Sequence, residues 1–277
     1  MTSADLRRSL IAALSGAAVA LAAAACSSSA AAPAAPAASS PASSAVAAAG
    51  PSSSSSAPAA AARATGAFTV TGNHPVAPNG SQDTSAEAAG ARCDQAELAA
   101  DQHTGKVIAI GFTVTSLPVS ADLLRHFLAG TGTPVSYPAG SGISALAAGS
   151  AAFTAVNKEV EAAVAEQLRA GRTQVRLTAA QLPLVPFDSA GGDLYWGFRG
   201  TQGLTVTGSG RRTGTAFTGT LSYVIRDSYG FPAGDVLGGF GAPMRYLQTV
   251  CGAPQHAGGA HWFPDSITVT VPFRQPA

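Results

Sequence analysis

The 277-residue sequence has little charge of either sign: charged residues make up 11% of it and the net charge is +1. Lysine is nearly absent, since Lys106 and Lys158 are the only two. Nucleic-acid binding needs a concentrated basic face, so this composition argues against a nucleic-acid partner. A surface so poor in charge must instead be covered by serine, threonine, glycine and glutamine.

The sequence also lacks an apolar run that would span a bilayer comfortably, because about 20 strongly apolar residues are needed. The longest candidate, Leu10 to Leu21, is diluted by alanine, serine and glycine. It follows Arg7-Arg8 and precedes the small residues Ala23-Ala24-Ala25, which is the three-part pattern of an export signal. We therefore predict a signal peptide over residues 1–25.

Cysteine is scarce as well, and the first of three, Cys26, directly follows this signal. Leu21-Ala22-Ala23-Ala24-Ala25-Cys26 resembles the lipobox of bacterial lipoproteins, with Ala23 where family members usually carry leucine. The resemblance implies a diacylglycerol on Cys26, and two acyl chains give stable membrane anchoring. Cleavage to a freely secreted protein is the alternative. Arg7-Arg8-Ser9-Leu10-Ile11 also resembles a twin-arginine export signal, so the export route stays open.

Residues 26–64 are almost entirely alanine, serine and proline after the cysteine. They have no apolar periodicity and no large side chains to bury, so nothing offsets the entropy lost on ordering them. We predict a disordered tether with a reach of about 35 Å. Such a tether would hold a folded domain clear of the membrane.

From residue 65 to residue 277 aromatic and β-branched residues appear, and the length suits a single globular domain. Cys93 and Cys251 are the remaining cysteines, and an even pair in an exported protein indicates one disulfide. Closing so long a loop would stabilise the fold by about 4–5 kcal/mol in the chain-entropy model. A pair of free buried thiols is the alternative.

Apolar residues at helical spacing predict two amphipathic helices, one capped by Ser120 and ended by Gly130, the other from about Ala151 to Ala170. A short third helix is predicted from Pro243 to Val250. Alternating β-branched and aromatic residues predict strands at Phe68–Thr71, Val107–Val114, Thr173–Thr178, Tyr195–Phe198, Leu204–Thr207, Ala216–Arg226 and Ile267–Phe273. Because the helices cluster, we expect an α+β fold. In it the two amphipathic helices pack on a mainly antiparallel sheet, and the short third helix precedes the last strand.

The common catalytic signatures are missing. No Gly-x-Ser-x-Gly elbow occurs, and neither lysine has a serine three places before it, as penicillin-interacting enzymes require. The stretch from Gly140 to Ala145 matches a dinucleotide loop only superficially, because no convincing strand precedes it. No cofactor is expected.

Metal ligands are also few. His256, His261 and Asp265 lie close in sequence, but on a glycine-rich stretch that we predict to be a loop. We expect solvent-exposed histidines there and no metal site. His126 lies beside the apolar face of the first predicted helix and is expected to pack rather than to react.

The densest polar and aromatic cluster is Arg226-Asp227-Ser228-Tyr229-Gly230-Phe231, at the predicted end of a long strand. Structural turn chemistry is the favoured interpretation: Asp227 accepts hydrogen bonds from the following turn, and Arg226 pairs with it or with a neighbour. The alternative is a carboxylate pair of Asp227 and Asp193 that cleaves glycosidic bonds.

Four short motifs follow one another along the domain: Phe127–Val135, Leu194–Phe198, Asp227–Phe231 and Met244–Leu247. Their order resembles a domain of uncharacterised secreted proteins of actinobacteria, and the resemblance covers residues 115–275. Cys251-Gly252-Ala253-Pro254 stands where such proteins tend to continue with Gly-x-Ala. The resemblance implies export and a similar fold, and no activity.

Two functions remain. The first is a lipoprotein on the extracytoplasmic side of the cell membrane, whose non-catalytic domain binds a cell-wall component, a small ligand or an envelope protein. The second is an exported hydrolase acting on a wall or polysaccharide substrate. A cleft where two of Asp193, Asp227, Asp235 and Asp265 converge would favour the hydrolase, whereas an apolar groove without titratable groups would favour binding.

Overall fold

The computed structural model describes residues 66–77, 92–187, 192–232, 241–253 and 258–277. The predictions about the signal, Cys26, the tether, Asp235 and His256 concern residues outside these ranges. Inside them, no helix has the length and apolar character needed to cross a membrane.

Six strands form one mixed sheet in the order β2-β6-β5-β4-β1-β3. The strands are β1 (Ala67–His74), β2 (Val135–Tyr137), β3 (Gln174–Leu177), β4 (Gly203–Thr213), β5 (Ala216–Tyr229) and β6 (Phe263–Pro276). The central pairings β1–β4, β4–β5 and β5–β6 are antiparallel, while the edge strands β2 and β3 pair in parallel. The expected α+β fold with a mainly antiparallel sheet is therefore confirmed.

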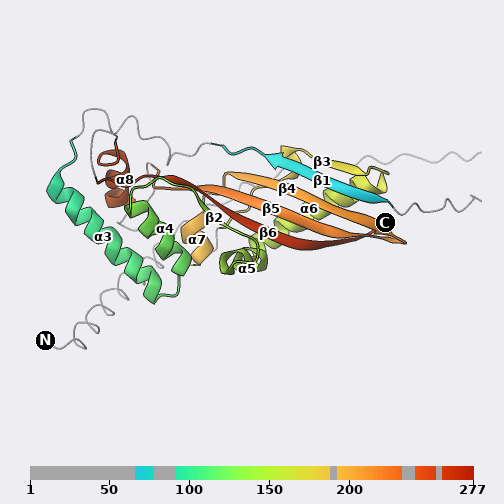
Figure 1. Ribbon diagram of the computed structural model, residues 1–277, viewed down its shortest axis with the longest axis horizontal. Helices are drawn as coiled ribbons and strands as arrows, with labels where there is room; N and C mark the ends of the chain where they lie inside the picture. Colours follow the sequence, from blue (N-terminus) through green and yellow to red (C-terminus); the bar gives the residue numbers. More distant parts are fainter. Residues whose placement is uncertain (1–65, 78–91, 188–191, 233–240, 254–257) are drawn as a thin grey trace, which may run out of the picture.

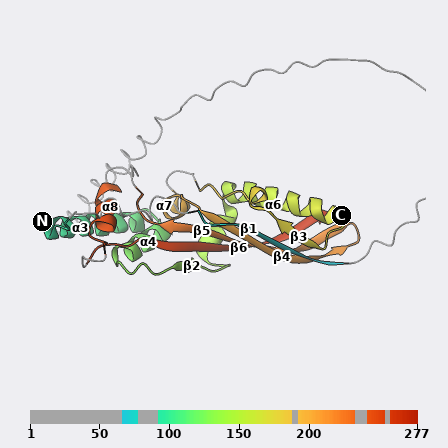
Figure 2. The same cartoon turned by 90° about the horizontal axis from the view of Figure 1, so that it is seen from above.

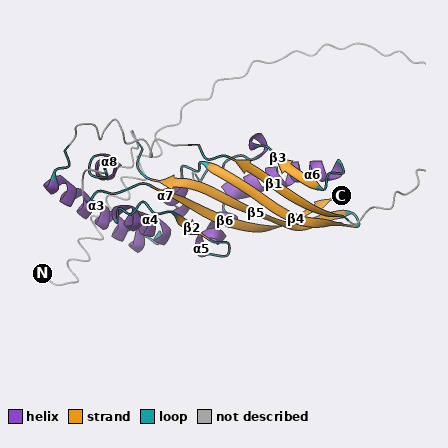
Figure 3. Ribbon diagram, turned by 45° about the horizontal axis from the view of Figure 1, so that its top comes forward, coloured by secondary structure: helices purple, strands orange, loops and turns teal. Residues whose placement is uncertain are grey.

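The helices are α3 (Gln95–Val114), α4 (Pro118–Leu128), α5 (Gly142–Gly149), α6 (Ala151–Arg169), α7 (Asp193–Phe198) and α8 (Gly241–Thr249), with a 3-10 turn η1 (Ala179–Gln181). Figure 1 shows α3, α4 and α8 gathered at one end of an elongated molecule, with the β4–β5 turn and the C-terminus at the other. Helices α6 and α7 lie on the same side of the sheet (Figure 2). The molecule thus has a mainly helical end and a mainly strand end (Figure 3).

Helix α6 covers the buried face of the sheet. The Ser150 side chain caps it by accepting a hydrogen bond from the Phe153 backbone N–H at 3.1 Å. The predicted apolar stripe is buried as expected: Phe153, Val156, Val160, Val164 and Leu168. Phe153 packs edge-on against Tyr223 of β5, with ring centroids 5.1 Å apart. This contact anchors the helix over the middle of the longest strands.

The opposite face of the sheet carries mostly hydroxyl groups. Successive strand residues point to opposite faces, and the alternation of buried and exposed residues in β5 and β6 follows this rule. The exposed or half-exposed serines and threonines are Ser136, Ser209, Ser222, Ser266, Thr69, Thr71, Thr205, Thr207, Thr213, Thr218, Thr220, Thr268 and Thr270. This face agrees with the surface expected from the low content of charged residues.

One predicted strand, Val107–Val114, is wrong: it forms the second half of helix α3. The Asp94 carboxylate caps this helix by accepting hydrogen bonds from two backbone N–H groups of its first turn, at 2.8 and 3.0 Å. A Cβ atom at Gly105 would lie 2.8 Å from a Leu128 methyl carbon, so glycine allows α3 and α4 to approach closely. Cap and helix packing here override the β preference of the branched side chains.

A second predicted strand, Tyr195–Phe198, is also wrong and lies in helix α7. The predicted N-cap of the first amphipathic helix, Ser120, is wrong as well. Helix α4 begins at Pro118 rather than after Ser120, and no side chain at its N-cap bonds to it. Instead the Asp193 carboxylate of α7 accepts hydrogen bonds from the backbone N–H groups of Val119 and Ser120, at 3.0 and 2.7 Å. Helix α4 therefore depends on α7 for the acceptor of its first backbone N–H groups.

The helical end is closed by a covalent link. Cys93 and Cys251 form a disulfide with their Cα atoms 4.9 Å apart, as the cysteine count predicts. It joins the residues just before α3 to those just after α8. Helix α8 occupies nearly the predicted range, whereas β2 and α5 were not predicted. The disulfide thus ties the start of α3 to the end of α8, which precedes the last strand.

Candidate functional site

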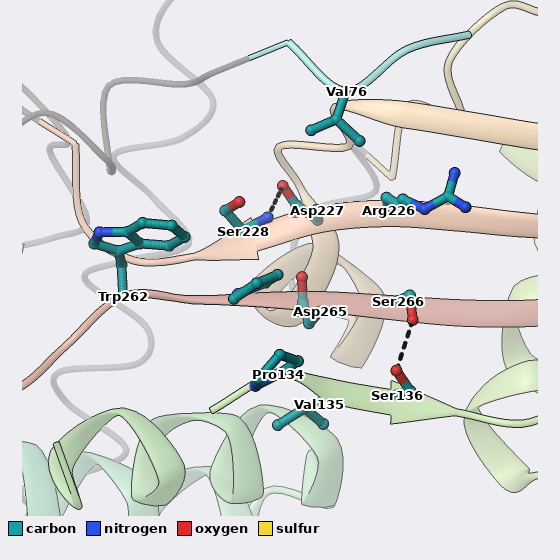
Figure 4. A pocket seen from close by; sticks show the side chains of 11 residues that line it. Val76, Pro134, Val135, Ser136, Arg226, Asp227, Ser228, Trp262, Asp265 and Ser266 are labelled. Atoms are coloured by element: carbon teal, nitrogen blue, oxygen red, sulfur yellow. Dashed lines mark hydrogen bonds between the residues drawn. The ribbon is translucent and has the colours of Figure 1, made fainter. Parts of the chain in front are cut away.

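A pocket of about 340 Å³ opens where β2, β6 and β5 lie side by side, near the helical end of the sheet (Figure 4). We refer to it as the Trp262 pocket. Its apolar lining residues are Val76, Pro134, Val135, Trp262 and Pro264. Its polar lining residues are Ser136, Arg226, Asp227, Ser228, Asp265 and Ser266. Ligand pockets typically measure about 300–1,000 Å³, so this one would take a small ligand or one segment of a longer chain.

His126 of α4 holds two sides of this pocket together. Its Nε2 atom lies 2.8 Å from the Thr133 carbonyl oxygen, within hydrogen-bond distance. Its ring also packs edge-on against Phe263, with centroids 4.5 Å apart. The bond fixes the loop that carries Pro134, and the ring contact fixes the residue next to Trp262. His126 therefore packs, as predicted from its place beside the apolar face of the helix.

Val76 forms the opposite rim. The backbone N–H of the next residue, Ala77, donates to the Gln202 carbonyl oxygen at 3.2 Å. Gln202 in turn donates its backbone N–H to the Arg226 carbonyl oxygen at 2.8 Å. Backbone hydrogen bonds thus place Val76 beside β5 although the two are distant in sequence.

The polar side chains of the rim bond to one another. Ser266 donates a hydrogen bond to Ser136 at 3.0 Å across the parallel β6–β2 pair. The Arg226 guanidinium donates to the Thr205 hydroxyl, and in Figure 4 it points away from the other lining residues. The sequence suggested either Asp227 or a neighbouring residue as the partner of Arg226. In the structure the partner is a neighbour, Thr205. The aliphatic stem of Arg226 is what borders the pocket.

Two aspartates occupy the centre of the lining. Asp227 and Asp265 are directly opposite each other in the antiparallel β5–β6 ladder, where Cβ atoms are about 4.5–5.5 Å apart. They are 5% and 3% exposed. Alternation along the strands puts their side chains on the same side as Ile225 and Ile267, toward the face that α6 and α7 cover. The backbone of the pair thus forms pocket floor, and the carboxyl groups lie beneath it.

The two carboxyl groups have unequal surroundings. Burial raises the pKa of Asp227 to about 7, against the opposing effects of backbone N–H groups of Ser228 and Gly200 and of the Arg199 charge. The Ser228 backbone N–H donates to the Asp227 carboxylate at 2.8 Å. The sequence predicted a bond of this kind, but from a turn rather than from the next residue of the strand. Burial, followed by the charge of Asp227, raises the pKa of Asp265 well above its usual range.

Asp265 has no hydrogen-bond donor among the described residues: neither carboxylate oxygen receives a bond from any N–H or hydroxyl group there. Its own backbone N–H lies near enough to lower the pKa of Asp265, and this is the weakest of the effects on that group. An ionised carboxylate buried in this way is highly unfavourable. The protonation state of this pair is therefore the main electrostatic question of the site.

The predicted site residues lie at other places in the fold than the sequence suggested. Asp193 caps helix α4 and is not paired with Asp227, whose cross-strand partner is Asp265. The sequence predicts a loop at Asp265, but this residue belongs to strand β6. The sequence favours turn chemistry at Asp227, yet β5 continues through it to Tyr229.

A signal for the burial of Asp265 was present in the sequence. The alternation of Ile267 and Val269 extends backwards to Asp265 and Phe263 at the same spacing. Extending the strand by that rule would have put Asp265 on the buried face. Val76 had no such signal, because nothing local connects it to the pocket.

Of the suggested ligands, His261 and Asp265 are described, and they are not gathered into a metal site. His261 is exposed, whereas Asp265 is buried within β6. Over the described ranges no group of three or more histidine, cysteine, aspartate or glutamate side chains could hold a metal ion.

Comparison of the chain with models of protein families, with curated proteins and with solved structures finds no match. The geometry of the pocket therefore carries the functional argument.

Proposed function

We propose that this chain is an exported envelope protein, anchored by a lipid on Cys26, whose domain binds a cell-wall glycan in the Trp262 pocket. The observation that carries the proposal is the pocket itself, in which an indole and several apolar side chains border a sheet face rich in hydroxyl groups. Membrane and wall are then its two partners, and no catalytic step is required.

The chemistry of the lining suits a sugar ring. Trp262 is half-buried, and Pro134 and Pro264 flank the same opening. An aromatic face offers large contact area to the C–H groups of a pyranose, and it does so with little loss of conformational entropy. The neighbouring serines and threonines are suited to hydrogen-bond a glycan that extends beyond the pocket along the open sheet face.

A second candidate, the exported hydrolase, is favoured by the convergence of Asp227 and Asp265. Carboxyl groups in unequal environments are what an acid and a base require. Binding comes first for a geometric reason: both carboxyl groups are almost completely buried, on the other side of the floor from the Trp262 opening. A substrate in the pocket would not reach them without movement of the strands.

Intrinsic fluorescence tests the proposal, because the chain has only two tryptophans. Trp196 packs against Phe112, with ring centroids 5.7 Å apart, and does not line the pocket. In a Trp196→Phe variant the emission reports on Trp262 alone. Titration with soluble peptidoglycan fragments from the host should shift this emission in a saturable way.

The matched control is Trp262→Phe, which keeps the emission of Trp196. We expect no shift from this variant. Trp262→Ala should weaken binding at least tenfold, about 1.4 kcal/mol. Because Trp262 is only half-buried, the substitution should lower the unfolding free energy by about 1–2 kcal/mol, less than for a fully buried tryptophan. Unchanged binding in Trp262→Ala would show that the ligand lies elsewhere.

The time course of the reaction with the fragments distinguishes a hydrolase from a binding protein. Binding alone reaches equilibrium and leaves the fragments intact, whereas hydrolysis releases new reducing ends steadily. Turnover by the wild type that is lost in a folded Asp227→Asn variant would put the second candidate first.

The anchor is tested on the native protein from the membrane fraction of its host. Mass spectrometry of the N-terminal peptide should find a diacylated or triacylated Cys26, and Cys26→Ser should move the protein into the medium. An unmodified N-terminus in the medium of the wild type would instead indicate a diffusible protein.

A further inference from the structure

The Asp227–Asp265 pair raises the question of how two buried, adjacent acids are tolerated. Both oxygens of Asp265 lack a donor among the described residues, and the side chain is 3% exposed. Where no donor or cation compensates, a buried carboxyl group takes up a proton rather than keep its charge. A carboxylic acid has one O–H, and Asp227 is the acceptor directly across the ladder.

We infer that Asp227 and Asp265 together hold one proton in the folded domain at neutral pH, and that losing it loosens the β5–β6 floor of the Trp262 pocket. The proton site is carried by the cross-strand register, by the burial of both side chains and by the unsatisfied oxygens of Asp265.

The surroundings decide which acid carries the charge. Asp227 receives backbone N–H groups from Ser228 and Gly200 and lies in the field of Arg199, all of which favour its ionised form. For Asp265 the only such group is its own backbone N–H, the weakest of the effects on its pKa. Asp227 is therefore the carboxylate of the pair, and Asp265 is the acid that donates to it.

The other charged groups on the packed elements do not supply a substitute for the proton. Burial, followed by Asp265 once it has lost its proton and by the charges of Asp122 and Asp193, raises the pKa of Tyr137 on β2 to about 12. Tyr137 is therefore neutral at physiological pH, and the aspartates of α4 and α7 only add negative charge. Arg226 belongs to the opposite face and bonds to a threonine of β4.

The direction of the pH effect follows from these shifts. A carboxyl group whose pKa is higher in the folded than in the unfolded chain binds more protons when folded. Its protonation favours folding fully below the unfolded pKa, about 3.9, and this advantage is lost as the pH rises to the folded value. For Asp227 the window runs from about pH 4 to about 7, and for Asp265 it extends to higher pH.

The floor of the pocket would respond because it belongs to the same strands. Ser228 and Ser266 follow the two aspartates in sequence and line the opening from the other face. Repulsion between two ionised carboxylates would push β5 and β6 apart at this point. The proton and the response of the floor depend on the two carboxyl groups and their strands, whether or not the ligand proves to be a glycan.

The first test needs no variant. An infrared spectrum of the folded domain at pH 7 should contain the carbonyl band of a protonated carboxyl group, because surface acids are ionised there. Hydrogen exchange of the backbone amides of residues 225–229 and 263–267 should speed up between pH 6 and pH 9 by more than the intrinsic pH effect, and the amides of β1 should not.

The second test compares Asp265→Asn with Asp193→Asn. The Asp265→Asn substitution keeps the shape of the side chain, and the new amide donates to Asp227 without a titrating proton. Between pH 5 and pH 8 the melting temperature of the wild type should fall by about 3 °C or more relative to Asp265→Asn. Asp193→Asn, which alters an aspartate with donors, should melt lower at every pH and keep the wild-type slope.

The results that would overturn the inference are equally definite. They are the absence of a protonated carboxyl band at pH 7, or a melting temperature whose pH dependence is the same in the wild type and in Asp265→Asn. If Asp265→Asn does not fold, the infrared band and the exchange rates of the wild type decide the question.

Discussion

Strand β5 contributes to two buried polar sites, and only the second contains a side chain without a hydrogen-bond partner among the described residues. Beneath α6 the Tyr223 hydroxyl donates to the Asn157 side chain at 2.6 Å, and the amide of Asn157 donates to Glu161 at 2.9 Å. Further along the same strand Asp227 faces Asp265, whose oxygens receive no hydrogen bond from any described residue.

The two places differ in what they do for the protein. A buried polar group with partners specifies a structure at little net cost, because each lone pair and proton is used. A buried acid without partners destabilises the fold at neutral pH unless it keeps a proton. The satisfied network fixes where α6 lies on the sheet. Asp265, the unsatisfied member of the second site, lies beside the pocket that we assign to a ligand.

The largest effect is expected from the apolar end of the sheet. Phe273 is 1% exposed and packs edge-on against Phe68, with centroids 5.8 Å apart. Phe273→Ala should lower the unfolding free energy by about 3–5 kcal/mol through the lost contacts and the cavity left behind. Chemical denaturation at pH 5 and pH 8 should give the same loss. A loss that depended on pH would mean that this end is coupled to the acid pair.

The next largest effect is expected from Asp193→Ala. Its comparison with Asp265→Asn contrasts an aspartate that has hydrogen-bond partners with one that has none among the described residues. Removing Asp193 leaves the N–H groups of Val119 and Ser120 without their acceptor, so it should cost about 1–3 kcal/mol. Denaturation of this variant beside Asp265→Asn at pH 8 gives the comparison directly. Equal stability of the two variants would show that hydrogen-bond partners do not distinguish the two aspartates.

The smallest effect is expected from Tyr223→Phe, about 1 kcal/mol for the loss of one satisfied hydrogen bond. Burial, followed by the charge of Glu161, raises the pKa of Tyr223, so the hydroxyl stays neutral and the loss should be equal at pH 5 and pH 8. A double-mutant cycle with Asn157→Ala measures the coupling of the pair. Additive losses would contradict the bond as the stabilising contact.

Helix α6 could be predicted from the sequence because every local signal agreed. Ser150 caps it, Gly171 with φ of 83° follows its end, and the apolar stripe between them repeats at helical spacing. Helix α3 could not, because its branched residues favour a strand in isolation. Its one local signal was Asp94 followed three residues later by Glu97, the pattern of a helix start. Packing against α4 settled the matter.

The sequence by itself determined which side of its strand each side chain takes, since that depends only on alternation between neighbours. Tyr223, Ile225 and Asp227 share one face for this reason. Only the tertiary structure decided that Asp227 meets Asp265 and not Asp193. Cross-strand register joins residues far apart in the chain, and a shift by one residue would exchange the two faces. The physical reason is that alternation is a local property of the backbone, whereas register is chosen by the packing of the whole sheet.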